Sequence, residues 1–140
     1  MSPTHPAASA SAPRPAALAL ALPATIVDPG LSPETVWAVA ESIVRLARAF
    51  LAQEIVVYDS DVAALPPGHI SRTAGLLTRL LQYHQAPKHI RGAIPDPHND
   101  LHPYKNLPCP FDPAAHTFQV RPARGLAAVL TESAHPDGCK

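Results

Sequence analysis

The feature that most constrains the fold is a capped amphipathic helix set between two short apolar runs. Ser32 can cap the first free amides of this helix, Pro33 occupies a position that needs no N–H, and Glu34 lies near the positive end of the helix dipole. Apolar residues then recur at spacings of three and four: Val36, Val39, Ile43, Ala47 and Phe50. This spacing predicts a helix with one buried face.

Two apolar runs flank the helix and predict strands. Residues 18–28, "LALALPATIVD", alternate leucine with alanine before Pro23, which favours an edge position or a bend. Residues 54–60, "EIVVYDS", form a short β-branched and aromatic run just after the helix, with Asp59 at its carboxyl end. A strand, a helix and a second strand in this order indicate a right-handed βαβ unit with parallel strands.

A second helix is predicted to run into residues 80–94, "LLQYHQAPKHIRGAI". Its buried face is marked by Leu77, Leu80, Leu81 and His84, and Pro87 ends it. Residues 88–94, "KHIRGAI", would then form a short third strand, and the proline-rich residues after Ile94 are expected to be loop. The fold class is therefore α/β, with a strand-helix-strand-helix start of a parallel sheet.

The two ends of the chain differ from this middle part. Residues 1–16 are rich in Ala and Pro and are expected to be a disordered tail. Residues 117–140 are expected to be divergent or disordered, with at most a short helix. The apolar run from Ala16 to Val27 is too short and too broken by proline to span a bilayer, so no membrane partner is expected.

The chain has no excess of positive charge that would attract nucleic acid through a strong overall electrostatic field. Eleven basic side chains match eleven acidic ones, so any contact with nucleic acid has to come from local clustering. The two cysteines, Cys109 and Cys139, fall in predicted loops. This usage fits a reduced intracellular compartment better than a disulfide-bonded secreted domain.

Several histidines suggest a metal site at first sight. The candidate ligands are His84, His89, His98, His102, Asp96, Asp100 and Cys109. His98 and His102 have a spacing that metals use, but they lie among prolines in a loop that does not aim both rings at one point, so we expect surface histidines and no metal. The spacing of the histidines does not single out one of them as a base for Cys109, so nucleophilic catalysis by this cysteine is not indicated. The sequence also has no glycine-rich phosphate loop, which disfavours nucleotide hydrolysis.

A basic cluster around the end of the second helix is a candidate RNA contact. Its charged members are Arg72, Arg79, Lys88, His89 and Arg91, and Tyr83 adds a surface on which a base could stack. The alternative is that the two helical arginines solvate the exposed helix face, while Lys88 and Arg91 follow the helix C-terminus, where cations are favoured. The residues alone leave both interpretations open.

Two stretches, together with the order and spacing that join them, carry a resemblance to a known family. The stretches are "ALALPATIVDPGLSPETVWAVAESIVRLARAFLAQEIVVYDS" and "LLTRLLQYHQAPKHIRGAIPDPHNDLHPYKNLPCPFDP". Their most specific element is "LLQYHQAPKHIR", which is similar to a family pattern of Leu-Gln-Tyr, a proline, an aliphatic or aromatic residue and an arginine. Over residues 18–116 the chain resembles the N-terminal half of SPOUT-class RNA methyltransferases of eukaryotes and archaea, in which an OB-fold-like insertion interrupts the methyltransferase domain.

The resemblance implies a partial SPOUT, or α/β-knot, domain over residues 17–116. Such an enzyme transfers a methyl group from S-adenosylmethionine to RNA as a homodimer, in the nucleus or nucleolus. By resemblance, Leu80, Leu81 and Tyr83 pack the helix end, Pro87 turns the chain, and Ile90 and Arg91 enter the next strand. The residues expected nearest to RNA are Arg91 and Lys88, followed by Arg72 and Arg79.

After residue 116 the chain departs from the family, and the knotted C-terminal segment that holds the cofactor is expected to be absent. No catalytic or cofactor-binding residue is therefore assigned, and the chain alone is expected to be inactive and to bind no S-adenosylmethionine. Two alternatives remain. One is an interaction fragment that pairs with a full-length relative through an uncovered apolar face from Val36 to Phe50. The other is a small α/β binding module without enzymatic ancestry.

Overall fold

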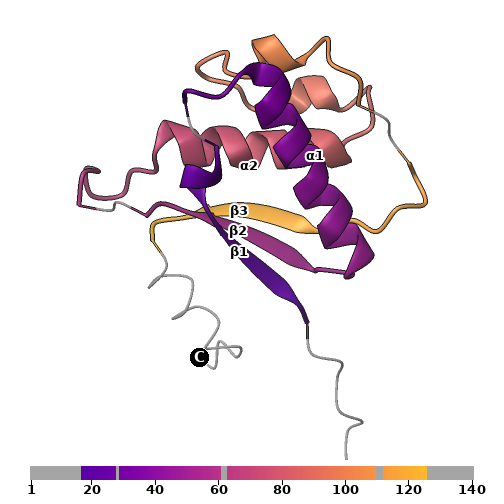
Figure 1. Cartoon of the computed structure of the whole chain (residues 1–140), viewed down its shortest axis with the longest axis horizontal. Coiled ribbons are helices and arrows are strands. Elements are labelled where there is room, and N and C mark those ends of the chain that lie inside the picture. The colour runs from indigo at the N-terminus through magenta and orange to yellow at the C-terminus, as the bar shows by residue number, and fades with distance from the viewer. Residues whose placement is uncertain (1–16, 28, 61–62, 110–111, 126–140) are drawn as a thin grey trace, which may run out of the picture.

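A computed structural model describes residues 17–27, 29–60, 63–109 and 112–125. Strands β1 (Ala19–Pro23), β2 (Glu54–Tyr58) and β3 (Gln119–Ala123) form one parallel sheet in the order β1-β2-β3. Helices α1 (Pro33–Ala49) and α2 (Arg72–Gln85) both lie on the same side of this sheet (Figure 1). The predicted α/β class and the strand-helix-strand-helix start are confirmed. The expected tail at residues 1–16 and short helix near the C-terminus lie outside the described residues.

Helix α1 begins where the sequence predicts. The Ser32 hydroxyl oxygen accepts a hydrogen bond from the Thr35 N–H at 3.3 Å, as an N-cap does. The buried residues of α1 are Val36, Trp37, Ala40, Val44 and Ala47. The predicted apolar stripe was right at Val36 and Ala47 and wrong at Phe50, which follows the last helical residue and is 69% exposed. The α1 face that was expected to remain uncovered is therefore largely packed.

Strand β1 is shorter than its apolar run. It ends at Pro23, and the chain continues as the 3-10 helix η1 (Ala24–Ile26). β1 pairs in parallel with β2, with Ala19 opposite Glu54 and Pro23 opposite Tyr58. A proline at the last position of an outer strand costs little, because it removes no hydrogen bond from the middle of the sheet.

The third strand does not lie where the sequence predicted it. The segment 88–94 contains the 3-10 helix η2 (Arg91–Ala93), and Ile90 is 47% exposed there, so the expected strand is wrong. The strand is instead β3, which pairs in parallel with β2 and lies inside the segment 117–140 that was expected to be divergent or disordered. Residues 119–123 are thus part of the sheet.

The main core fills the space between the helices and the sheet. Its fully buried large side chains include Ile55 and Val57 of β2 and Leu77, Leu80 and Leu81 of α2. The predicted buried face of α2 is confirmed at these leucines and at His84. The opposite face of the sheet carries a separate small cluster of Val56, Ala123 and Tyr58. No helix among the described residues is long and apolar enough to cross a membrane.

Candidate functional site

The last turn of α2 holds the third strand by its two glutamines. The Gln82 amide nitrogen donates a hydrogen bond to the Val120 carbonyl at 3.3 Å. The Phe118 N–H donates to the Gln85 side-chain oxygen at 2.9 Å. These bonds tie the segment of β3 to the helix, while Leu80 and Leu81 on the same turn fill the core. The motif that carried the resemblance is therefore a structural junction.

An aromatic cluster covers another side of the same helix end. The ring centroids of Trp37 and Tyr83 are 5.8 Å apart in an edge-on arrangement, and those of Trp37 and Tyr104 are 5.9 Å apart and stacked. The Trp37 indole N–H donates to the Pro108 carbonyl at 3.1 Å. Because Tyr83 is only 9% exposed, its ring packs inside the protein and offers no open surface on which an RNA base could stack.

Arg91 faces the same interior. Its Nε donates to the Ala86 carbonyl at 3.0 Å, and one terminal nitrogen donates to the Cys109 carbonyl at 3.0 Å. The guanidinium carbon also lies 5.0 Å from the centre of the Tyr83 ring, within cation–π range. Arg91 thus joins the end of α2 to the loop at Cys109, and its planar fork is already used by the protein.

Cys109 and His84 form a pair that the sequence spacing did not reveal. The Cys109 sulfur lies 3.7 Å from the His84 Nδ1 and 3.1 Å from an Arg91 nitrogen. Burial lowers the pKa of His84 to about 4, and burial raises the pKa of the Cys109 thiol. Both groups are therefore uncharged at neutral pH. A neutral thiol beside a neutral imidazole is a packing contact and not an activated nucleophile.

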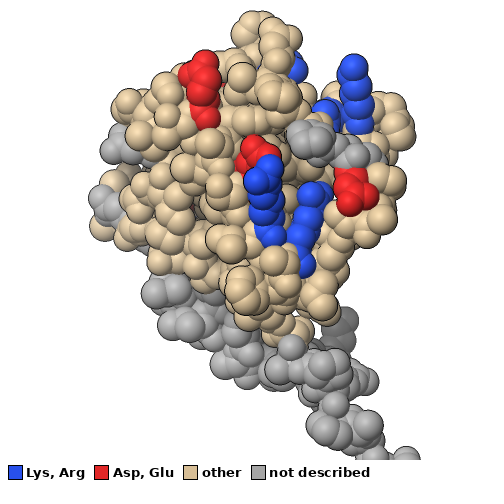
Figure 2. Space-filling model, turned by 45° about the vertical axis from the view of Figure 1, so that its right-hand side comes forward, with Lys and Arg blue, Asp and Glu red and all other residues tan. Residues whose placement is uncertain are grey.

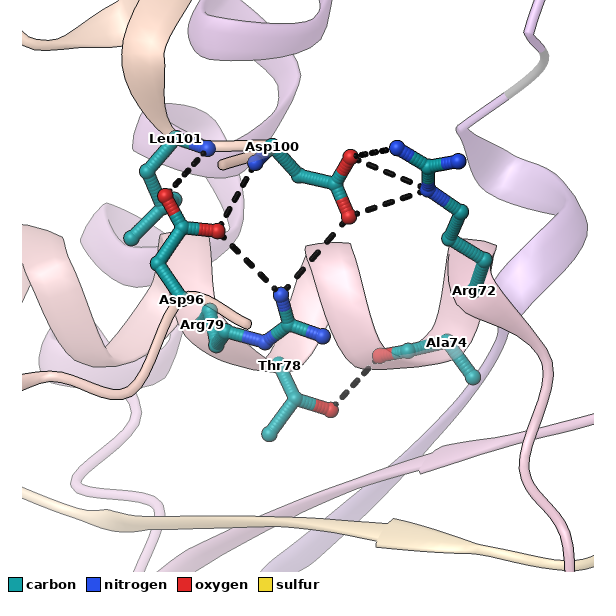
Figure 3. Close-up of polar contacts among 7 residues, drawn as sticks. All are labelled: Arg72, Ala74, Thr78, Arg79, Asp96, Asp100 and Leu101. Atoms are coloured by element: carbon teal, nitrogen blue, oxygen red, sulfur yellow. Dashed lines mark hydrogen bonds and ion pairs between the residues drawn. The ribbon is translucent and has the colours of Figure 1, made fainter. Parts of the chain in front are cut away.

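Arg72 and Arg79, predicted near RNA, meet two aspartates above α2 (Figure 3). Nε of Arg72 donates to both Asp100 carboxylate oxygens, at 3.0 and 3.1 Å, and Arg79 lies 3.6 and 3.7 Å from the Asp96 and Asp100 carboxylates. Hydrogen bonds from Arg72 hold the pKa of Asp100 below its ordinary value. A Cβ added at Gly75 would lie 2.7 Å from a terminal nitrogen of Arg79, so glycine leaves room for the guanidinium.

The four predicted RNA-proximal residues differ in how accessible they are. The Arg72 side chain is 67% exposed and the Arg79 side chain 15%. Lys88 is exposed and forms no ion pair with any residue that the structure describes. On the face shown in Figure 2, basic side chains stand apart or beside acidic ones and build no continuous basic surface. The structure therefore brings Arg72 and Arg79 together and places Lys88 and Arg91 at the other end of α2.

A hollow of about 320 Å³ lies at the carboxyl ends of β1 and β2. Its apolar walls come from Ala24, Val27, Pro29, Ala64 and Leu65, and its polar groups come from Thr25, Asp59, Ser60, Ser71 and Thr73. A second hollow of about 220 Å³ shares Val27, Pro29 and Thr73 with the first and reaches Arg72 and Asp100. Ligands of parallel α/β sheets bind outside the carboxyl ends of the strands, which makes this edge the candidate site.

Asp59 joins β2 to the start of α2 at this edge. The carboxylate is buried, with the residue only 4% exposed, and it accepts hydrogen bonds from the Ser71 N–H at 2.9 Å and from the Ser71 hydroxyl. The Ser71 oxygen in turn accepts from the Ala74 N–H at 3.1 Å and caps α2. The sequence placed Asp59 at a strand end, but its partner Ser71 is twelve residues further along the chain.

The histidines do not gather into a metal centre within the described part of the chain. His84 is buried against Trp37, with ring centroids 4.2 Å apart, whereas His89, His98 and His102 are exposed. Among the residues that the structure describes, no three histidine, cysteine or acidic side chains are placed to hold a metal ion.

Comparison with known proteins identifies the family. Residues 17–116 match the model of a family described as "Putative RNA methyltransferase". The chain is similar to the 28S rRNA (uridine-N(3))-methyltransferase of Homo sapiens, with 32% identity over 114 residues that cover 76% of this chain and 30% of that protein. The Drosophila melanogaster protein of the same name is 27% identical over 141 residues, which cover 90% of this chain and 29% of the relative. The chain thus spans about 30% of the length of these relatives, and it belongs to this family of RNA methyltransferases.

Proposed function

We propose that this chain takes part in the methylation of RNA, with uridine of ribosomal RNA as the target and S-adenosylmethionine as the methyl donor. The observation that carries the proposal is the family match over residues 17–116, together with relatives named for methylation of uridine in 28S rRNA. The SPOUT class, the α/β knot and the homodimer that the resemblance implies belong to this proposal. So do a place in the nucleus or nucleolus and a first domain over residues 17–116; the strand β3 supports a boundary that lies further along the chain.

The hollow at the carboxyl ends of β1 and β2 is small for the intact cofactor. Its volume of about 320 Å³ is near the lower limit of the ~300 to 1,000 Å³ that ligand pockets usually have. We therefore assign no residue of this chain to S-adenosylmethionine and propose that these 140 residues are inactive by themselves.

The proposed RNA surface uses the predicted basic residues in two ways. Lys88 and Arg72 are exposed and can reach phosphates directly, although Arg72 has to share its charge with Asp100. Arg79 forms ion pairs with Asp96 and Asp100, and Arg91 donates a hydrogen bond to the Cys109 carbonyl. They act by holding the loops in place.

The test measures cofactor and RNA separately on the 140-residue chain. We expect isothermal calorimetry to give no heat of binding for S-adenosylmethionine, and fluorescence anisotropy to show weak binding of a uridine-rich single-stranded RNA that falls as salt rises. Lys88→Ala should weaken RNA binding, and Lys105→Ala is a matched control at another exposed lysine. Micromolar binding of S-adenosylmethionine would contradict the proposed inactivity, and RNA binding that neither salt nor Lys88→Ala alters would contradict the RNA surface.

A second candidate function is that of an interaction fragment that binds a longer relative. The observation that favours it is a group of exposed apolar side chains at the carboxyl end of α1. Leu46 is 56% exposed, Phe50 is 69% exposed and Leu51 is 63% exposed. Co-expression with a full-length relative, followed by affinity purification of either protein, decides this. We expect Phe50→Ser to reduce any complex, and absence of a complex with the unaltered chain excludes this function.

A further inference from the structure

The hollow at the carboxyl ends of β1 and β2 combines one buried acceptor with several hydroxyl groups. The acceptor is the Asp59 carboxylate, whose two oxygens each accept one hydrogen bond from Ser71. Each carboxylate oxygen has two acceptor positions, so one position remains on each. Around this carboxylate the hollow carries the hydroxyls of Thr25, Ser60 and Thr73, none of which bonds to another described residue.

These groups are of the kinds that one edge of a pyrimidine base requires. The base-pairing edge of uracil presents a carbonyl oxygen, an N–H and a second carbonyl oxygen in a row. A carboxylate accepts from the central N–H, and hydroxyls on either side donate to the two carbonyl oxygens. Cytosine has an acceptor nitrogen in the place of that N–H, and it would face the buried carboxylate without a proton between them.

The walls and the size of the hollow favour a small flat ligand. Val27, Pro29 and Leu65 provide apolar surface for the faces of a ring, as nucleobase pockets of enzymes that act on an unstacked base do. A volume of about 320 Å³ holds a single base with its sugar. The adjoining hollow continues from Thr73 to Arg72, whose exposed guanidinium is paired with Asp100 of the same hollow.

We propose that this hollow binds one unstacked uracil nucleotide, with Asp59 accepting a hydrogen bond from N3–H of the base. The inference rests on the proposed function and names a substrate-binding residue for it. Methylation at N3 replaces this hydrogen by a methyl group, so the same carboxylate that accepts from the unmodified base opposes the methylated one. The hollow therefore distinguishes an unmodified uridine from its N3-methylated form.

The test is a titration of the 15N-labelled 140-residue chain with single nucleotides, followed by NMR chemical shifts. We expect uridine 5′-monophosphate to shift the amide signals of Thr25, Ser60 and Thr73 with a millimolar dissociation constant. The 3-methyluridine and cytidine monophosphates should bind at least tenfold more weakly. Equal shifts for all three nucleotides, or none for the uridine compound, would overturn the proposal.

Two variants and a control make the assignment specific. Thr25→Val removes one hydroxyl from the lining of the hollow without changing the shape of the side chain. It should weaken the binding of uridine monophosphate several-fold. Asp59→Asn should remove the preference for uridine monophosphate over 3-methyluridine monophosphate. Asp112→Asn, at an exposed loop aspartate, is the control and should leave binding unchanged. Because Asp59 also supports the start of α2, Thr25→Val decides the question if Asp59→Asn does not fold. Unchanged affinity in Thr25→Val then counts against the site.

The outcomes separate this inference from the proposed function. One outcome is that the chain binds uridine-rich RNA in a salt-dependent way without distinguishing uridine from 3-methyluridine. That result would support the proposed RNA surface and contradict the uracil site. If S-adenosylmethionine shifts the same signals more strongly than uridine monophosphate, the hollow belongs to the cofactor and both the uracil site and the proposed inactivity are wrong.

Discussion

Lowering the pH from 7 to 4.5 should destabilise this domain through one histidine. His84 has a pKa of about 4 in the folded protein against an ordinary value of 6.5. The unfolded chain therefore binds a proton at His84 at higher pH than the folded protein does. The stabilisation is fully present above pH 6.5 and is lost as the pH falls toward 4, at up to about 1.4 kcal/mol for each pH unit.

The size of the effect follows from the surroundings of the ring. Burial is the main cause of the lowered pKa; the charge of Glu41 raises it, while the charges of Arg91 and Arg48 lower it. From the folded and unfolded values, the free energy of unfolding should fall by about 2.5 kcal/mol between pH 7 and pH 4.5. This is a large share of the ~5 to 15 kcal/mol by which domains are usually stable.

Urea unfolding followed by tryptophan fluorescence measures this directly. Trp37 is the single tryptophan of the chain and packs against His84, so its emission reports unfolding at the right place. We expect His84→Gln to lose most of the pH dependence between 6.5 and 4.5, and His98→Gln, at an exposed histidine, to keep it. The unfolding experiment stays above pH 4, because Asp100 would add a pH dependence of its own below that. Its pKa is lowered in the folded protein, so the stability it contributes is lost at more acidic pH. A His84→Gln variant with the same pH slope as the unaltered chain would refute the reasoning.

Three further perturbations test the packing around α2 and α1. Arg91→Ala removes charged hydrogen bonds to two backbone carbonyls and should lower the free energy of unfolding by about 2 kcal/mol. In a thermal melt this corresponds to a melting temperature lower by roughly 10 °C, whereas Lys88→Ala should melt as the unaltered chain does. Equal melting of the two variants would show that Arg91 does not hold the loop. Leu80→Ala empties a fully buried position and should cost about 3 kcal/mol in urea unfolding; a loss below ~1 kcal/mol would contradict the packing. Phe50→Ser should change stability by less than ~0.5 kcal/mol and reduce self-association in light scattering, and a clear loss of stability would mean that this ring is covered.

The elements that could be predicted are those whose signals are local. The cap at Ser32 and the apolar spacing of α1 identify a helix without knowledge of the rest of the chain. The run of residues 54–58 is apolar because β2 is the middle strand and is buried on both faces. Leu77, Leu80 and Leu81 similarly mark the buried face of α2.

β3 escaped prediction because its stabilising contacts are distant in sequence. Its residues, "QVRPA", include one β-branched side chain, an arginine and a proline, which is a weak strand signal. Pro122 is tolerated because β3 is an outer strand of the described sheet, and Arg121 forms an ion pair with Glu54 of β2. The glutamines of α2 add hydrogen bonds that no local pattern could reveal. The segment 88–94, more apolar by composition, had no such partners and stayed outside the sheet.

The site was predictable only in part, for a related reason. Residue type suggested that Arg91 and Tyr83 face RNA, but charge and aromaticity do not say which way a side chain points. Asp59 was visible at a strand end, yet only the fold brings it to Ser71 and to the hydroxyls of the hollow. Predicting such a site requires knowing which loops follow neighbouring parallel strands.

The residues that make the family recognisable and the residues of the proposed uracil site are therefore separate sets. In the motif "LLQYHQAPKHIR", the leucines fill the core, the glutamines hold β3, Tyr83 and His84 pack on Trp37, and Arg91 anchors a loop. Substitution of these buried or hydrogen-bonded residues changes the fold first, so loss of function in such a variant would not identify a catalytic group; the exposed Lys88 is an exception. The polar groups of the hollow have the opposite property. The hydroxyls of Thr25, Ser60 and Thr73 bond to no described residue, so replacing them tests binding with little effect on folding.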